Sequence, residues 1–237
     1  MPGTIVDMHV HTTRGAADSS LTPDQLIEEA RRIGLTGINL TEHDRLWDPY
    51  LLREFREKSG LFVSQGMEVS TDLGHMIVVG LDTYVPGIRK ALELRRVLDD
   101  VGGFMTVAHP FRHFFDPVHF RRQGLEPFEL TPEEAAKLPI FQLVDAIEVL
   151  NGCNTPRENY FALQVAHALG KPGTGGSDTH SQNGLGYFTT VFEKHLESQE
   201  QMLAEMHAGR FFPAHGLIFG EVIPFEEGSL DIQMGLA

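Results

Sequence analysis

The sequence predicts an α/β fold, a distorted (β/α)7 barrel of the TIM type that forms a single domain over residues 1–237. Three observations predict it. Short apolar runs alternate along the chain with amphipathic segments that carry helix caps, as in βαβ units. No repeat, low-complexity tract or Gly/Ser linker interrupts the alternation, and 237 residues are enough for one barrel. Residues of metal-ligand type follow several apolar runs, where a barrel has its active site.

The first βαβ unit is the clearest part of the pattern. Residues 4–8 form an apolar strand, and the segment Thr22-Pro23-Asp24-Gln25 is a capping box with proline at the first helical position. Apolar residues three and four apart follow, and Gly34 ends the helix. Residues 37–41 then form the next buried strand.

The same arrangement recurs along the rest of the chain. We expect strands over residues 61–65, 76–81, 104–108, 146–150 and 171–175, and helices over residues 88–101 and 199–208. Two further capping boxes, at Thr131 and Thr155, each begin a helix. Residues 111–130 are expected to be a loop insertion, and long loops in compact domains are often functional.

Charge and cysteine content exclude several classes of function. The formal net charge of −14 disfavours a surface for long nucleic acid or anionic membrane, because it would repel phosphates. Phosphate would have to be captured locally, which bound divalent cations can do. With Cys153 as the one cysteine and no signal peptide or run of about 18 apolar residues, we expect a cytoplasmic protein without a membrane segment.

Candidate metal ligands stand at the ends of the predicted strands. His9 and His11 alternate on one face of the first strand, so both imidazoles can reach one ion. Later strand ends contribute Glu42-His43-Asp44, Glu68, His109 and Ser177-Asp178-Thr179-His180. A lone histidine is usually structural, but imidazole and carboxylate groups at so many strand ends indicate a site for divalent metals.

The order of these motifs resembles the PHP family, named for polymerase and histidinol phosphatase. The matching segments, over about residues 4–215, are His-Val-His-Thr, Thr-Glu-His-Asp, Gly-Met-Glu-Val-Ser, Ala-His-Pro, Ile-Glu-Val-Leu-Asn-Gly and Gly-Ser-Asp-Thr-His. The resemblance implies a distorted seven-stranded β/α barrel with two or three divalent metal ions. Ligand type alone does not separate zinc, manganese and iron.

The resemblance also implies which residues hold each ion. A first ion would have four ligands: His9, His11, Glu68 and Asp178. Glu68 would bridge to a second ion held also by His109, and a third would lie near Asp18, His43 and His180. The remaining ligand of the second ion would follow Glu148, with Cys153 preferred, Asn151 next and an inert thiol as the alternative.

Other residues are candidates for binding or transforming the substrate. Arg112 is placed to fork around phosphate oxygens, with Arg14 and Arg45 as weaker alternatives. His75 lies by the substrate in similar proteins, or supports a ligand from behind. The residues expected to take part in catalysis are His180, Asp178 and Arg112, with His180 able to protonate the leaving alkoxide.

We therefore expect a metal-dependent phosphoesterase that hydrolyses a phosphomonoester, a small nucleotide or a short oligonucleotide with a metal-activated hydroxide. Two alternatives stay open. An amidohydrolase also begins with a His-x-His strand, but it typically carries a bridging lysine, and Lys137 and Lys171 are badly placed for that role. A non-catalytic PHP module, in which metals only stabilise the fold, would be expected to have lost ligands, whereas this set is nearly complete. The oligomeric state does not follow from the sequence.

Overall fold

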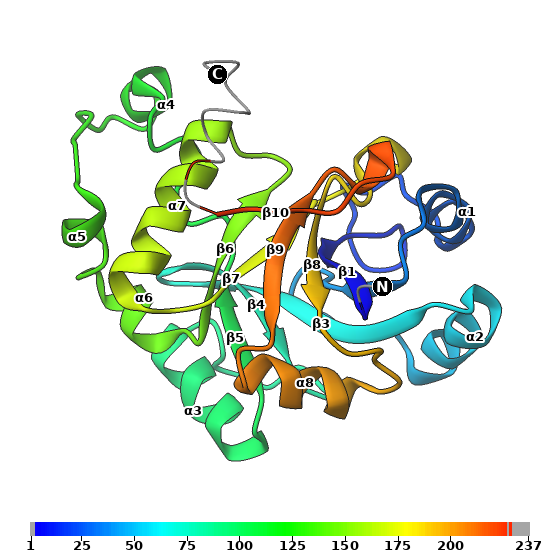
Figure 1. The fold of residues 1–237 in the computed structure, drawn as a ribbon. Coiled ribbons are helices and arrows are strands. Elements are labelled where there is room, and N and C mark those ends of the chain that lie inside the picture. Colours follow the sequence, from blue (N-terminus) through cyan, green and yellow to red (C-terminus); the bar gives the residue numbers. More distant parts are fainter. Residues whose placement is uncertain (1–2, 227, 229–237) are drawn as a thin grey trace.

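A computed structural model describes residues 3–226 and 228. Its strands form one strongly curled sheet in the order β10-β9-β8-β1-β2-β3-β4-β5-β6-β7, with helices on its outer side (Figure 1). The α/β class is confirmed. The regular alternation of a (β/α)7 barrel is not, because several neighbouring strands are antiparallel, and β3 is joined to β4 by a turn with no helix between them.

The first three strands are parallel and are joined by helices. Strand β1 (Thr4–Val10) pairs with β2 (Gly37–Leu40), which pairs with β3 (Phe62–Thr71). Helix α1 (Pro23–Ile33) begins with the predicted capping box and ends at Gly34, whose φ of 75° favours glycine. Helix α2 (Pro49–Ser59), which the sequence analysis did not predict, is capped by Asp48.

Strands β3, β4 (Gly74–Val79) and β5 (Phe104–Val107) form an antiparallel unit. A tight turn joins β3 to β4, in which the Thr71 hydroxyl donates to the Gly74 carbonyl at 2.6 Å and Gly74 has a φ of 109°. The predicted strand over residues 61–65 therefore extends to Thr71. Helix α3 (Ala91–Val101) leads to β5, which runs parallel to β3.

The second parallel unit consists of β5, β6 (Ala146–Asn151) and β7 (Gly173–Gly176). Helix α7 (Pro156–Leu169) begins with the predicted box at Thr155, whereas the box at Thr131 begins only the short helix α5 (Pro132–Ala135). The expected loop insertion contains helix α4 (Pro117–Arg122), and α6 (Pro139–Leu143) precedes β6. In Figure 1, α4 and α5 lie outside α7, away from the curled sheet.

Three antiparallel strands extend the sheet beyond β1: β8 (Phe188–Phe192), β9 (Phe211–His215) and β10 (Ile223–Pro224). Helix α8 (Gln199–His207) connects β8 to β9, close to the predicted bounds. The short 3-10 helices η1 (Gln182–Gly184) and η2 (Leu217–Phe219) lie before β8 and after β9.

The curl brings β7 back against β1 and β8. Val10 bridges in parallel to Thr179, and the Thr190 hydroxyl accepts from the Gly175 N–H at 2.9 Å. The ends of the six parallel strands β1, β2, β3, β5, β6 and β7 therefore converge at one rim.

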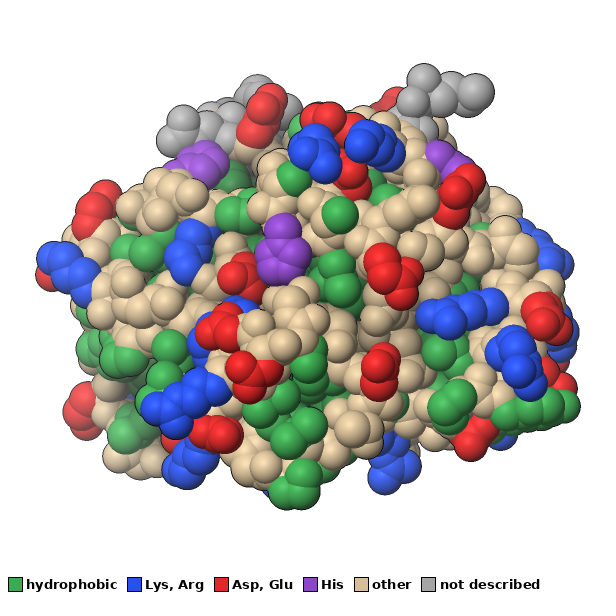
Figure 2. Space-filling model, turned by 90° about the horizontal axis from the view of Figure 1, so that it is seen from below, with side chains coloured by type: hydrophobic (Ala, Val, Ile, Leu, Met, Phe, Trp, Pro, Cys, Tyr) green, Lys and Arg blue, Asp and Glu red, His purple; other side chains and the backbone are tan. Residues whose placement is uncertain are grey.

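No helix in the described part of the chain is long and apolar enough to cross a membrane. On the face that carries α3 and α8, acidic and basic side chains are interspersed (Figure 2).

Candidate metal centre

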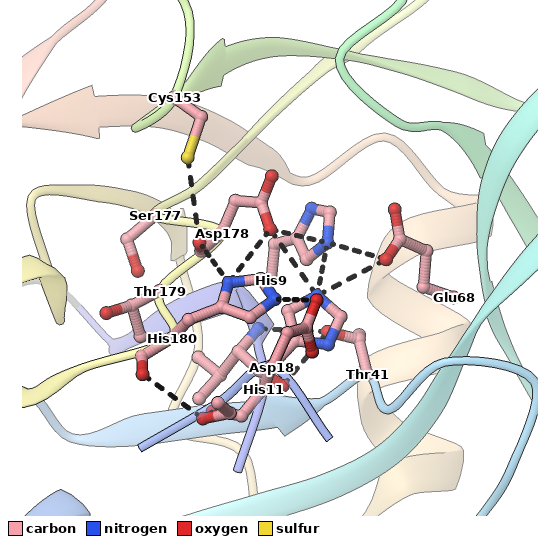
Figure 3. Close-up of polar contacts among 12 residues, drawn as sticks. His9, His11, Asp18, Thr41, Glu68, Cys153, Ser177, Asp178, Thr179 and His180 are labelled. Atoms are coloured by element: carbon pink, nitrogen blue, oxygen red, sulfur yellow. Dashed lines mark hydrogen bonds and ion pairs between the residues drawn. The ribbon is translucent and has the colours of Figure 1, made fainter. Parts of the chain in front are cut away.

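Apart from Cys153, the predicted ligands lie together at the converging strand ends, and Figure 3 shows His9, His11, Glu68, Asp178 and His180 among them. Three groups of side chains bring ligand atoms to within 4.8 Å of one another: His9, His11 and Asp178; His9, Glu68 and His109; and His11, His43 and His180. We call these the first, second and third clusters. His9 belongs to the first and second clusters and His11 to the first and third, so the three clusters form one continuous centre.

The first cluster is fully buried and closely spaced. The Nε2 atoms of His9 and His11 are 3.0 Å apart. Asp178 Oδ1 lies 3.4 Å from each of them, and Glu68 Oε2 lies 3.5 Å from His9 Nε2 and 3.3 Å from His11 Nε2. A tetrahedral ion with bonds of about 2.0–2.1 Å has ligand–ligand edges of about 3.3–3.4 Å. The four distances from the two carboxylates to the two imidazoles match that spacing to within 0.1 Å, and the His9–His11 distance is shorter, so these four residues fit a divalent cation.

The protonation of His9 agrees with this assignment. Its Nδ1 lies 2.9 Å from Glu148 Oε1 and donates to that buried carboxylate. The lone pair of Nε2 is then directed at the cage, as expected of a metal-binding imidazole held by a carboxylate. The Nδ1 atom of His11 is buried without a hydrogen-bond partner in the described part of the chain, which is rare for a group with no further role.

The second cluster centres on the other oxygen of Glu68. Glu68 Oε1 is 3.0 Å from Nε2 of His109 and 2.9 Å from Nδ1 of His75. The two oxygens of Glu68 thus face different clusters, the arrangement that a bridging carboxylate requires. His75, expected near the substrate or behind a ligand, lies beside the second cluster with 42% of its side chain exposed.

The third cluster is the most open. The rings of His43 and His180 each stack on His11, at centroid distances of 4.2 and 4.3 Å. Asp18 Oδ2 lies 3.5 Å from Nε2 of both His43 and His180. The structure therefore brings Asp18 to this cluster, although its side chain is 63% exposed.

The backbone is strained at three of these strand ends. Asp44, His109 and Asp178 have φ values of 50°, 30° and 52°, which non-glycine residues seldom adopt. Hydrogen bonds hold the first two in place: the Asp44 N–H donates to the Glu68 carbonyl, and the His109 N–H donates to Glu148 Oε2 at 2.7 Å. Strain of this kind persists where the surroundings fix it and is common at functional sites.

Negative charge dominates the first cluster. Burial alone would lower the pKa of His9, but Asp178, Glu148 and Glu68 outweigh it and hold that pKa well above its ordinary value. Burial opposes ionisation of Glu68 and Asp178, yet His9 and its neighbours keep the pKa of both carboxyls well below the usual range. The cage thus favours a positive charge, which a proton or a metal ion can supply.

The histidines of the third cluster differ in charge preference. Burial and the neighbouring His11 lower the pKa of His180, whose Nδ1 lies 3.1 Å from the Asp178 carbonyl. His180 is therefore neutral at pH 7 and offers Nε2 as an acceptor. The hydrogen bond to Glu68 raises the pKa of His43, despite the opposing effect of burial.

Arg112 lies at the site as expected, paired with Asp178. Its Nη2 donates to Asp178 Oδ2 and, at 2.9 Å, to Oδ1 of Asn151. Its buried Nε has no hydrogen-bond partner among the described residues. The guanidinium therefore neutralises the candidate ligand Asp178, and its Nε–H remains available to a further acceptor.

The two candidates for the remaining ligand of the second ion have other partners. Asn151 accepts from Arg112 and from the Cys153 N–H, and donates to Glu148 Oε2 at 2.9 Å. The Cys153 thiol points toward the Asp178 carbonyl, 3.9 Å away (Figure 3), and belongs to none of the three clusters. Burial and Asp178 raise the pKa of this thiol, so it stays protonated at neutral pH.

The alternative arginines are not brought into the centre. Arg45 is exposed, and no hydrogen bond or ion pair joins it to the clustered residues in the described part of the chain. Arg14 is also exposed and lines a separate groove beside Trp47.

Sequence reasoning missed the residues that support the ligands from behind. Glu148 contacts His9, His109 and Asn151, as described above. Asp7 accepts from the N–H groups of His9, Ser177 and Gly186 at 3.2, 2.9 and 2.9 Å, and burial raises its pKa to about 6. The available signal was an acidic residue inside a short, mostly apolar segment predicted to be a strand.

Part of the chain resembles known sequences. A family model described as PHP-associated matches residues 156–211. Error-prone DNA polymerases from Mycobacterium tuberculosis and Nocardia farcinica are 33% identical to this chain over 64 residues. The alignment covers 27% of this chain and 6% of each polymerase, so the chain spans a small fraction of the length of these relatives.

Solved structures share the fold at low sequence identity. PsfC from Pseudomonas syringae has a TM-score of 0.60 and 16% identity, covering 100% of this chain and 96% of that chain. A proposed metal-dependent phosphoesterase from Bifidobacterium adolescentis has a TM-score of 0.58 and 18% identity, covering 87% and 98%. An amidohydrolase from Chromobacterium violaceum, solved with sulfate and no metal, has a TM-score of 0.56 and 17% identity, covering 85% and 96%.

Proposed function

This chain belongs to the PHP domain family, and from that premise we propose that it is a metal-dependent phosphoesterase. One observation carries the proposal: His9, His11, Glu68 and Asp178 converge with the spacing of a four-ligand cation cage. The second cluster adds His109, and the third adds Asp18, His43 and His180. Two or three divalent ions held there would activate water and neutralise phosphate charge.

The chain's own residues would bind and orient the phosphate. Arg112 contacts the candidate ligand Asp178 and has an Nε with no partner among the described residues, so it would bind a phosphate oxygen while it keeps Asp178 ionised. Neutral His180 suits the role of a metal ligand better than that of a proton donor. The proposed substrates are phosphomonoesters, small nucleotides or short oligonucleotides.

An amidohydrolase reaction is the less favoured alternative. The Lys171 ammonium donates to the Val144 carbonyl, just before β6, and none of the three clusters contains a lysine. The described part of the chain therefore lacks the bridging lysine on which that alternative depends.

Metal reconstitution tests the proposed function. We expect metal-free protein loaded with zinc, manganese or ferrous iron to bind two or three equivalents and to hydrolyse p-nitrophenyl phosphate. Since removing a supporting group typically costs about 10–100-fold, His9→Ala should lower turnover at least ~100-fold and reduce the metal content. His195→Ala, an exposed histidine outside the clusters, is the matched control.

The enzyme proposal would be wrong if the metal-loaded protein did not hydrolyse p-nitrophenyl phosphate and His9→Ala changed only the stability. A non-catalytic module stabilised by metal would then describe the protein.

A further inference from the structure

A cavity of about 360 Å³ lies beside the second cluster. His75, His109 and Arg112 line one part of it. The remainder is lined mainly by apolar side chains, among them Leu73, Val107, Phe111, Leu138, Ile140 and Phe141.

The polar groups of this cavity all belong to the metal centre or touch it. His75 and His109 approach the same oxygen of Glu68, and Arg112 contacts Asp178. A phosphate held by the clusters and Arg112 would therefore lie at the polar part of the cavity. Its organic group would then extend along the apolar wall.

The charge of the wall limits what that organic group can be. No lysine, aspartate or glutamate of the described residues lines the cavity. Arg112, its one arginine, is already paired with Asp178. A second phosphate or a carboxylate on the substrate would find no partner there, and burial of an unpaired charge is strongly unfavourable.

Two leucines at the surface strengthen this argument. Leu73, in the turn between β3 and β4, is 41% exposed, and Leu138, just before α6, is 40% exposed. They come from separate segments, yet both line this cavity. Gly74 lines the cavity next to Leu73, and apart from its chain neighbours no atom lies within 4 Å of where a Cβ would stand.

We propose, on the basis of the phosphoesterase function above, that this cavity selects phosphomonoesters whose organic group is uncharged and apolar. Leu73 and Leu138 are the specificity-determining residues. In the reaction, the oxygen of water forms a new bond to phosphorus and the ester P–O bond breaks. The proton that the water loses is taken up by the departing alkoxide oxygen. The products are inorganic phosphate and an apolar alcohol.

Butyl phosphate and glycerol 1-phosphate test the proposal, because their leaving alcohols are chemically similar and differ mainly in polarity. Each buried methylene group is expected to contribute roughly fourfold. We expect kcat/KM for butyl phosphate to exceed that for glycerol 1-phosphate at least tenfold. Leu73→Gln and Leu138→Gln should each reduce this ratio severalfold, mainly through KM. Leu92→Gln, at a 54% exposed position outside the cavity, should leave the ratio unchanged.

Binding supplies a readout that does not depend on turnover. Calorimetric titration should show butylphosphonate binding at least tenfold more tightly than methylphosphonate, with the difference reduced in Leu138→Gln. Equal turnover of the two esters, or a ratio unaffected by both leucine variants, would overturn the selectivity and leave the phosphoesterase function intact. If no phosphomonoester is hydrolysed, the proposed function fails, and equal affinity for the two phosphonates then overturns the apolar subsite as well.

Discussion

Glu148 shows how one side chain can order most of the centre. It is fully buried in β6, and its two carboxylate oxygens have different hydrogen-bond partners. Oε1 accepts from Nδ1 of His9, whereas Oε2 accepts from the His109 N–H and from the Asn151 amide. All three partners are donors, so the site requires a group that only accepts.

We predict that Glu148→Gln weakens metal binding by about 10–100-fold, the usual effect of losing a group that orients a ligand. The glutamine NH₂ must face at least one of the three donors and leave it unpaired, which should also lower the free energy of unfolding by about 1–3 kcal/mol. Competition with a chromophoric chelator measures the affinity, and the exposed Glu28→Gln is the matched control. Wild-type affinity in Glu148→Gln would contradict this role.

At the residue scale, strand-end positions predicted which candidate ligands lie close together, but did not predict the groups behind them. His9, His11, Glu68, His109 and Asp178 all lie in clusters because strand ends meet at one rim. Glu148 and Asp7 act through partners that are distant in the chain, such as His9 and Ser177 respectively. A local sequence pattern cannot predict these long-range contacts.

At the element scale, local signals predicted the helices that begin with a capping box, and missed helix α2 and several strands. The boxes at Thr22 and Thr155 begin α1 and α7 because the capping bonds form within one turn. Strands β8 and β9 depend on pairing with β1 and with each other, which sequence spacing does not specify. The box at Thr131 begins only four helical residues, since a cap fixes where a helix starts and not its length.

Helix α8 is tied to the neighbouring strands by Glu205. Its carboxylate accepts from Nε and Nη2 of Arg210 at 2.6 and 2.8 Å, just before β9, and pairs with Lys194 after β8 at 3.1 Å. The bonds from Arg210 are the main cause that lowers the pKa of Glu205 to about 2.

Because this pKa is depressed, the stabilisation from Glu205 is fully present above the pKa of an unfolded glutamate, near 4.5. It is lost as the pH falls from there through about 2. We predict that Glu205→Gln is less stable than the wild type at pH 7 and that the difference shrinks below pH 4.5. Urea unfolding at pH 7 and at pH 3 measures it, with Glu28→Gln as the control. An equal difference at both pH values would contradict the assignment.

At the scale of the whole molecule, the site exists because the sheet curls until β7 meets β1. The alternation of strands and helices in the sequence predicts parallel strands, and the candidate ligands lie at the ends of these strands. It does not predict that β3 and β4 are antiparallel, because this pairing depends on a short hydrogen-bonded turn at Thr71 and Gly74. That turn brings His75 beside Glu68 and thereby sets one wall of the centre.

Gly176, at the end of β7, lies close against His9 of β1. A Cβ there would lie 2.5 Å from the Cβ of His9 and 2.7 Å from its main-chain nitrogen, and both belong to a buried strand that cannot easily move. We predict that Gly176→Ala lowers the free energy of unfolding by about 1–3 kcal/mol, as overpacking does. It should also weaken metal binding, because His9 contributes to the first and second clusters.

The control for this prediction must destabilise the protein without moving His9. Gly102→Ala does so: Gly102 ends α3 with a φ of 67°, and its added Cβ meets no atom within 4 Å. Backbone strain at such a position costs about 1–2 kcal/mol. Urea unfolding should therefore show similar losses in both variants, while chelator competition should show weakened metal binding in Gly176→Ala alone. Unchanged affinity in Gly176→Ala would mean that the close contact between β7 and β1 does not position His9 for metal binding.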